Sequence, residues 1–202
     1  MSKLEYIEWC DFWIEDQNNK DKPRVLLVGD SITRDYKGPV MELFKSEVTV
    51  NVMASSRGMD NEDYYFELGY ILNRDRFEYS AIHLNNGLHG NHLLADEYES
   101  LLDKTVLYIK ENSKAAIIIA LSTPVYRDDT KYENEDNERV LERNKRARKV
   151  AERYGLPVND LYTLSYDKEE MRIGDGFHYN ATGSKIQAEQ VVEYIKTALQ
   201  MR

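Results

Sequence analysis

Short, almost wholly apolar runs constrain the fold of this chain more than any other feature of its sequence. Four clear runs and a shorter fifth occur, at residues 24–29, 48–53, 80–85, 115–121 and 156–158. Runs that are apolar at consecutive positions are typical of strands in a parallel sheet that is covered on both faces. They predict a sheet of five parallel strands.

Between these runs, apolar residues recur with the spacing of one helix face. Such stripes follow the second and third runs and the fifth run, and residues 136–154 form a charged helix that ends at Gly155. Another stripe, Tyr6, Trp9, Cys10 and Trp13, predicts a helix before the first strand. Alternating strands and helices predict a three-layer α/β/α sandwich. The length of 202 residues suits a single domain that spans residues 1–202.

Composition narrows the classes of partner. Hydrophobic residues make up 42% of the chain, which indicates a globular protein, and the formal net charge of −9 disfavours nucleic acid and anionic membrane surfaces as partners. A single cysteine, Cys10, allows no intrachain disulfide. No apolar run is long enough to cross a bilayer, so we expect no membrane insertion. We expect a cytoplasmic location for the chain as written, although a removed export signal would leave no trace in it.

Two segments carry candidate catalytic groups, one at a predicted strand end and one before the last predicted helix. Ser31 follows the first strand in Gly-Asp-Ser-Ile-Thr-Arg and opens the next helix, where serine is also a common helix cap. Asp175 and His178 lie three residues apart before the last helix, where they could equally be a turn former and a surface histidine. Ligands of such sheets bind beyond the carboxyl ends of the strands. Together the three residues match the nucleophile, base and orienting carboxylate of a catalytic triad.

Two further strand ends could help to stabilise negative charge. Asn85 and Asn86 follow the third strand, and an asparagine amide suits an oxyanion hole, although an Asn-Gly pair is also a common turn. Gly58 follows the second strand, where the lack of a Cβ lets a backbone N–H approach a ligand. Either segment alone is a weak indication.

These segments together resemble the SGNH hydrolase superfamily, which includes the GDSL-like esterases and lipases. Gly29-Asp-Ser31-Ile is similar to the first family block, Gly58 to the second-block glycine and Asp175-Gly-Phe-His178 to the last block. The resemblance implies a flavodoxin-like sheet with strand order 2-1-3-4-5. It also implies Ser31 as nucleophile, His178 as base, Asp175 as its partner, and an oxyanion hole of Ser31, Gly58 and Asn85.

The third family block departs from the usual pattern. His83 stands where the family has glycine and Asn86 where it has aspartate, so a shift of one residue would make Asn86 the oxyanion donor. His83, His89 and His92 are the candidate metal ligands, but they lack a supporting set of cysteines or carboxylates, so we expect no metal and no cofactor.

The remaining polar and aromatic residues shape our expectations for the rest of the site. Residues 126–137 are polar and acidic and follow the fourth strand, which predicts a mobile loop at the mouth of the site, with a plain solvated loop as the alternative. The fifteen tyrosines fall mostly at helical core spacing, and we expect no stacking group among them.

The resemblance implies a serine esterase that works through an acyl-enzyme. The polar residues beside the candidate site favour short acyl groups, especially acetyl esters of carbohydrates, over long chains. The expected partner is therefore a small-molecule or carbohydrate ester, and the sequence specifies no oligomeric state. Two alternatives stay open: a lysophospholipase or thioesterase of the same superfamily, and a catalytically silent binding module with the same fold.

Overall fold

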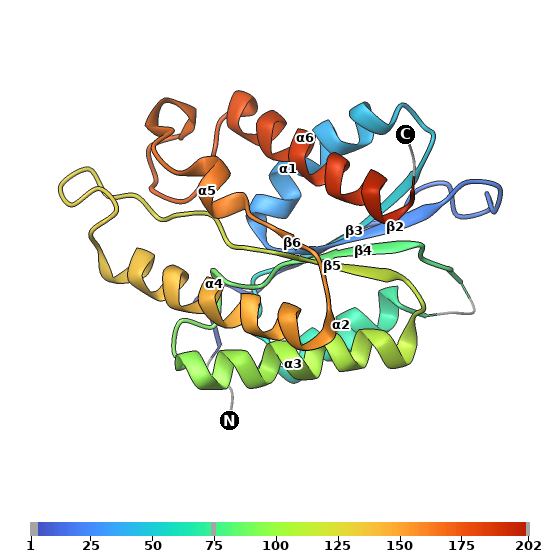
Figure 1. Ribbon diagram of the computed structural model, residues 1–202, viewed down its shortest axis with the longest axis horizontal. Coiled ribbons are helices and arrows are strands. Elements are labelled where there is room, and N and C mark those ends of the chain that lie inside the picture. Colours follow the sequence, from blue (N-terminus) through green and yellow to red (C-terminus); the bar gives the residue numbers. More distant parts are fainter. Residues whose placement is uncertain (1–3, 74–75, 201–202) are drawn as a thin grey trace.

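The fold is built on one sheet of six strands in the order β1-β3-β2-β4-β5-β6 (Figure 1). The structure is a computed structural model that describes residues 4–73 and 76–200. The strands are β1 (Cys10–Trp13), β2 (Arg24–Gly29), β3 (Thr49–Ser55), β4 (Ala81–Leu84), β5 (Ala116–Ala120) and β6 (Val158–Asn159). The helices are α1 (Ser31–Phe44), α2 (Glu62–Ile71), α3 (Ala95–Asn112), α4 (Glu135–Tyr154), α5 (Leu161–Ser165) and α6 (Ala181–Ala198), with a 3-10 turn at Glu169–Met171.

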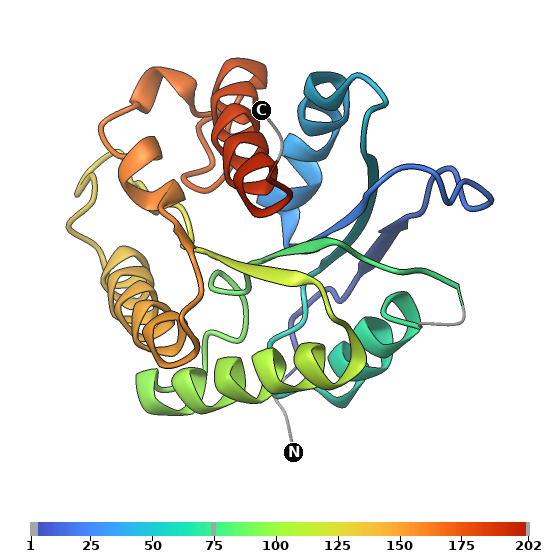
Figure 2. The same cartoon turned by 45° about the vertical axis from the view of Figure 1, so that its right-hand side comes forward.

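The helices cover both faces of the sheet, so the predicted three-layer α/β/α sandwich is confirmed. Helices α1, α5 and α6 lie on one face and α2, α3 and α4 on the other (Figures 1 and 2). Strands β2 to β6 are parallel and follow the order β3-β2-β4-β5-β6, which is the expected 2-1-3-4-5 order. The carboxyl ends of these strands therefore meet at one edge of the sheet.

The helix predicted around Trp9 and Trp13 is wrong, because this segment forms a sixth strand instead. β1 pairs antiparallel with β3, with Cys10 opposite Ser55. Cys10, Phe12 and Ile14 pack on one face of the sheet, whereas Trp9 packs on the other. Apolar residues at positions 9, 10 and 13 are compatible with a helix face and with a strand. A strand is favoured because it pairs with the backbone N–H and C=O groups on the outer side of β3, which would otherwise lack partners.

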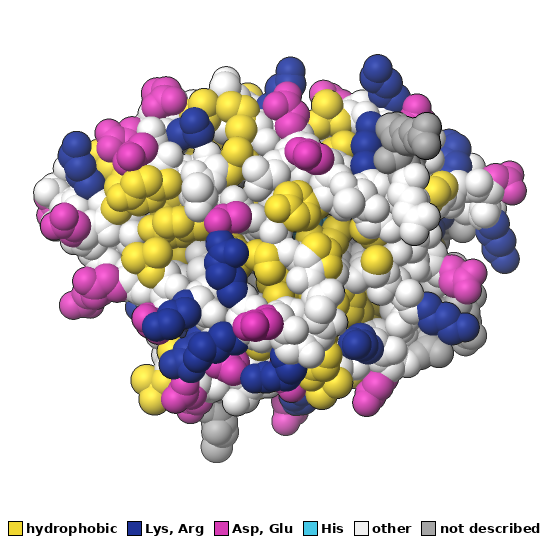
Figure 3. All heavy atoms as spheres, viewed as in Figure 1, with side chains coloured by type: hydrophobic (Ala, Val, Ile, Leu, Met, Phe, Trp, Pro, Cys, Tyr) yellow, Lys and Arg dark blue, Asp and Glu magenta, His cyan; other side chains and the backbone are white. Residues whose placement is uncertain are grey.

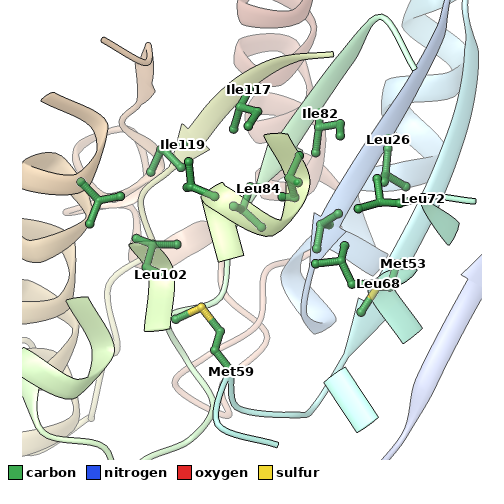
Figure 4. Close-up of a cluster of buried hydrophobic side chains, with 14 of the residues drawn as sticks. Leu26, Met53, Met59, Leu68, Leu72, Ile82, Leu84, Leu102, Ile117 and Ile119 are labelled. Atoms are coloured by element: carbon green, nitrogen blue, oxygen red, sulfur yellow. The ribbon is translucent and has the colours of Figure 1, made fainter. Parts of the chain in front are cut away.

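Consecutive residues of the central strands supply two separate cores. Leu26, Met53 and Ile82 face α2 and α3, where they contact a cluster that includes Leu68 and Leu102 (Figure 4). Their neighbours point the other way: Val25, Leu27, Val50, Val52 and Ile118 pack against α1 and α6. Each fully buried side chain of this size stabilises the fold by about 1.5–3 kcal/mol. This double burial explains why the strands are apolar at successive positions.

One polar side chain, that of His83, is fully buried between the sheet and α1. His83 in β4 is fully buried, and its Nδ1 lies 3.4 Å from the hydroxyl of Tyr36. The amide of Asn159 donates to its Nε2 at 2.9 Å. Burial lowers the pKa of His83 to about 3, so the imidazole is neutral in the folded protein. His83 is therefore a core residue with two polar partners.

We predict that His83 makes the protein sensitive to acid. Between pH 6.5 and about 3 the unfolded chain binds a proton at His83 that the folded chain does not. The free energy of unfolding therefore falls with falling pH in this window, by up to about 1.4 kcal/mol per pH unit from this residue. His83→Gln retains polar atoms but cannot titrate, so its stability should decline less steeply than that of the wild type. Urea unfolding at several pH values between about 4 and 7.5 measures the difference; equal slopes would contradict the assignment.

Candidate active site

Ser31 lies at the sharp turn where β2 passes into α1. Asp30 caps the helix, because its side chain accepts the backbone N–H of Ile32 at 3.0 Å. A Cβ at Gly29 would overlap the hydroxyl of Thr33, so this turn requires glycine. The turn leaves Ser31 partly exposed at the carboxyl edge of the sheet. Its position at the first residue of α1 also places it where unpaired backbone N–H groups face outward.

Asp175 and His178 lie in the loop before α6, and they meet Ser31 across the sheet edge. One oxygen of Asp175 accepts the backbone N–H groups of Phe177 at 2.9 Å and His178 at 2.8 Å. The other lies 2.6 Å from Nδ1 of His178. Nε2 of His178 lies 2.7 Å from Oγ of Ser31, 147 positions away in sequence. The three side chains named from the sequence thus form one continuous hydrogen-bonded relay.

The carboxylate at the end of this relay is held in its ionised form. Partial burial by itself raises the pKa of Asp175, but the backbone N–H and imidazole of His178 and the N–H of Phe177 outweigh it and lower the pKa to about 2. An ionised carboxylate at Nδ1 keeps a proton on that nitrogen. The lone pair of Nε2 is then directed at the serine hydroxyl, which is the arrangement that a general base needs.

The Asp175 loop is fastened to the rest of the molecule by two arginines. Arg172 donates to the carbonyl oxygens of Gly176 at 3.1 Å and Pro124 at 2.9 Å. Arg127 donates to the carbonyl oxygen of Asp175 at 3.4 Å. Gly176 has a φ of +84°, and a Cβ there would overlap the carbonyl oxygen of Tyr126. These contacts fix the loop that carries the carboxylate and the imidazole.

Gly58 lies where the loop after β3 packs closely against the loop that contains Gly90. A Cβ at Gly58 would come within 2.9 Å of the Cα of Gly90, so only glycine fits. The neighbouring Arg57 is held by ion pairs with Glu8 at 3.2 Å and with Glu67. Within residues 4–73 and 76–200 no acceptor is found for the backbone N–H of Gly58. This N–H is therefore without a protein acceptor among the described residues.

The two candidate asparagines have different surroundings. The amide of Asn85 donates to the carbonyl oxygen of Ala120 at 2.8 Å and to Oγ of Ser122 at 3.1 Å, which uses both of its protons. The amide of Asn86 donates to the carbonyl oxygen of Arg57 at 2.9 Å, and Asn86 also lies beside the hydroxyl of Tyr64. That carbonyl belongs to the same peptide as the N–H of Gly58. Asn86 is therefore the asparagine whose amide contacts the Arg57–Gly58 peptide directly.

A further carboxylate near the relay was not singled out from the sequence. Asp35 follows Ser31 by one helical turn, so both residues lie on the same face of α1. Burial raises the pKa of Asp35, and the neighbouring His178 and Arg34 act in the opposite direction. Arg34 in turn lies over the ring of Trp9 at 4.6 Å. The i, i+4 spacing from the serine is the pattern that could have identified Asp35.

The segment 126–137 borders the site, as expected, and it is tied to the Asp175 loop. The backbone N–H of Tyr126 donates to the carbonyl oxygen of Gly176 at 2.9 Å. The expectation of no stacked tyrosines is wrong here: Tyr132 stacks on Tyr166 at 4.3 Å between ring centres, and Tyr162 stacks on Tyr166 at 5.9 Å. The three rings come from the loop and from α5 with the residue after it. The mobility of the segment stays a prediction.

The three histidines considered as metal ligands lie in different places. His83 is in the core, His89 lies 3.6 Å from Glu5, and Nε2 of His92 lies 2.8 Å from Asp60. Across the part of the chain that the structure describes, no three histidine, cysteine or carboxylate side chains come together as metal ligands would. Over the same residues, no helix combines the length and apolar character needed to cross a bilayer.

Comparison with known proteins identifies the fold. No family model and no curated protein sequence matches the chain. Among solved structures, the lipase/acylhydrolase from Enterococcus faecalis superposes with a TM-score of 0.70 at 19% identity, over 87% of this chain and 96% of the other. A GDSL-like lipase from Bacteroides thetaiotaomicron superposes with a TM-score of 0.70 at 18% identity, over 90% of this chain and 92% of the lipase. An acetylxylan esterase from Geobacillus stearothermophilus superposes with a TM-score of 0.67 at 17% identity, over 86% of this chain and 94% of the esterase. The chain has the fold of the SGNH hydrolases.

Proposed function

We propose that this protein is a serine ester hydrolase with Ser31 as nucleophile, His178 as general base and Asp175 as the residue that orients the base. The observation that carries the proposal is the hydrogen-bonded relay from Asp175 through His178 to Ser31, with distances of 2.6 and 2.7 Å. A surface histidine or a helix cap would not require both contacts at once. The fold supports the same conclusion, because the neighbours named above are lipases, acylhydrolases and an esterase.

The proposed reaction is a two-step acyl transfer. Oγ of Ser31 attacks the ester carbonyl carbon while Nε2 of His178 takes the hydroxyl proton, and the ionised Asp175 stabilises the imidazolium that forms. The imidazolium then gives its proton to the departing alcohol, which leaves an acyl group on Ser31. A water molecule, deprotonated by the same histidine, attacks this acyl-enzyme. The products are the carboxylic acid and the free serine.

The negative charge on the carbonyl oxygen needs donors that point at it before the reaction begins. In our proposal, the backbone N–H groups of Ser31 and Gly58 are two of them, as the family resemblance implies. We assign the third to the amide of Asn86, not to Asn85, because Asn85 already donates both protons to β5 and Ser122. The unpaired N–H of Gly58 supports this placement.

For the substrate, we propose a short acyl group, in first place acetyl, on a carbohydrate alcohol. The residues that flank the relay are polar: Arg34 and Asp35 follow Ser31, and Arg127 and Asp128 border the Asp175 loop. A long acyl chain gains about 0.8 kcal/mol per buried CH₂ only where an apolar groove receives it. Among the neighbours, the protein from Geobacillus stearothermophilus is an acetylxylan esterase.

We predict that Asn86→Ala reduces kcat by about a hundred- to a thousandfold, which corresponds to about 2.7–4 kcal/mol of lost transition-state stabilisation. Asn85→Ala should cost mainly stability, since it leaves the carbonyl oxygen of Ala120 without its donor. Steady-state kinetics on p-nitrophenyl acetate, together with thermal unfolding of both variants, separates the two effects. A near-normal Asn86→Ala enzyme beside a folded but inactive Asn85→Ala protein would return the role to Asn85.

We predict that kcat/KM on p-nitrophenyl esters falls as the acyl chain lengthens from acetyl through butyryl to octanoyl. The reason is that each added CH₂ finds polar side chains instead of an apolar groove. Ser31→Ala, assayed with each ester, gives the background that must be subtracted. A rise in kcat/KM towards octanoyl would overturn the short-acyl proposal and favour the lysophospholipase or thioesterase alternative.

A further inference from the structure

A cavity of about 310 Å³ borders the far end of the catalytic relay. Its walls come from two segments, residues 126–128 and residues 169–176, and they include Asp175 with its two glycine neighbours. Neither Ser31 nor His178 lines it. The cavity therefore lies beside the acyl-transfer centre, and a group bound there would belong to another part of the substrate. Its volume falls in the range of small-molecule sites, about 300–1,000 Å³.

The side chains around this cavity suit a neutral ligand that carries many hydroxyl groups. The walls include the side chains of Tyr126, Asp128 and Glu169, together with Arg127 and Arg172, and they contain no aliphatic side chain. The two arginines already donate to Asp136, Gly176 and Pro124 and so hold the walls, whereas carboxylates such as those of Asp128 and Glu169 accept from hydroxyl protons. Charges of both signs give no preference for a strongly anionic or cationic ligand. An acyl chain would find no apolar surface here.

A group of tyrosines lies beside this cavity and contacts it through Tyr126. The ring of Tyr126 packs edge-on against Tyr132 at 5.4 Å, and Tyr132 continues into the stack with Tyr166 and Tyr162. Tyr166 is 40% exposed. In Figure 3, hydrophobic side chains gather at the left, between α5 and the loop that leads to α4. The face of an aromatic ring provides a flat apolar surface with a polar hydroxyl at its edge.

The walls are held in place before any ligand binds. The guanidinium of Arg172 lies 5.7 Å from the ring centre of Tyr126, 5.8 Å from that of Tyr132 and 4.7 Å from that of Tyr179. The same guanidinium donates to Gly176 and Pro124, so one side chain joins the tyrosines to the catalytic loop. A preformed site loses less conformational entropy on binding than a flexible one.

We propose that this cavity and its tyrosines form a subsite for the sugar units of an oligosaccharide ester, next to the unit whose ester reaches Ser31. The inference rests on the proposed esterase function and adds where the alcohol part of the substrate binds. It follows from three features together: the position beside Asp175, the polar walls without aliphatic groups, and the group of tyrosines next to Tyr126. An oligosaccharide is the kind of alcohol that is long enough to occupy both places and polar enough for these walls.

The kinetic test compares two substrates, p-nitrophenyl acetate and an acetylated xylose tetrasaccharide, and the readout is the ratio of their kcat/KM values. Tyr126→Ala and Glu169→Ala should each lower the ratio of tetrasaccharide to aryl ester by about tenfold, the effect of losing one good contact. Tyr70→Ala is the matched control, because Tyr70 is an exposed tyrosine on α2 at the other face of the sheet, and it should leave the ratio unchanged. An unaltered ratio in both cavity variants overturns the subsite.

A binding measurement keeps this result separate from the esterase proposal. The unacetylated xylose tetrasaccharide is titrated into the Ser31→Ala protein by calorimetry, where no turnover is needed. Binding that weakens about tenfold when Tyr126→Ala is added supports the subsite; equal binding with and without Tyr126→Ala overturns it. A wild-type protein that hydrolyses neither ester contradicts the proposed function, and the titration then decides the subsite alone.

Discussion

The site depends above all on the packing of α1 against α6. α1 begins at Ser31 directly after β2, and α6 begins at Ala181, three residues after His178. Both helices lie on the same face of the sheet and contact each other along their length (Figure 2). Because their starting loops meet at the carboxyl edge, the imidazole comes within 2.7 Å of the serine hydroxyl. A shift of α6 by one turn, about 5.4 Å, would separate them.

The parts of the fold that follow from local pattern could be predicted, and so could the residues of the relay. Strands β2 and β5 are apolar at successive positions because both faces are buried, and strand ends of a parallel sheet must meet at one edge. The strand-end rule places Ser31 at this edge, whereas Asp175 and His178 could be grouped with it because the two segments together match the triad pattern of the family. β1 could not be recognised, because apolar residues at positions 9, 10 and 13 fit a helix face as well as a strand. Its pairing with β3 is a long-range contact.

Features that arise from contacts between distant segments could not be predicted. Our choice between Asn85 and Asn86 depends on which amide donates to Ala120 in β5 and which donates to Arg57. The sequence does not distinguish these partners, because the two adjacent asparagines have the same chemistry. The tyrosine stack joins residues from a loop and from the region of α5, so no spacing within one element reveals it. The same holds for Arg172, whose contacts with Pro124 and Gly176 connect the stack to the catalytic loop.

The most direct test of the central claim asks whether Ser31 is the nucleophile that His178 activates. The protein is incubated with a serine-reactive phosphonate, and the modified residue is identified by peptide mass spectrometry. Our account predicts one adduct, on Ser31, that forms in the wild type, forms far more slowly in His178→Ala and is absent from Ser31→Ala. An adduct on another serine, or labelling of Ser31 at an equal rate in His178→Ala, would contradict it.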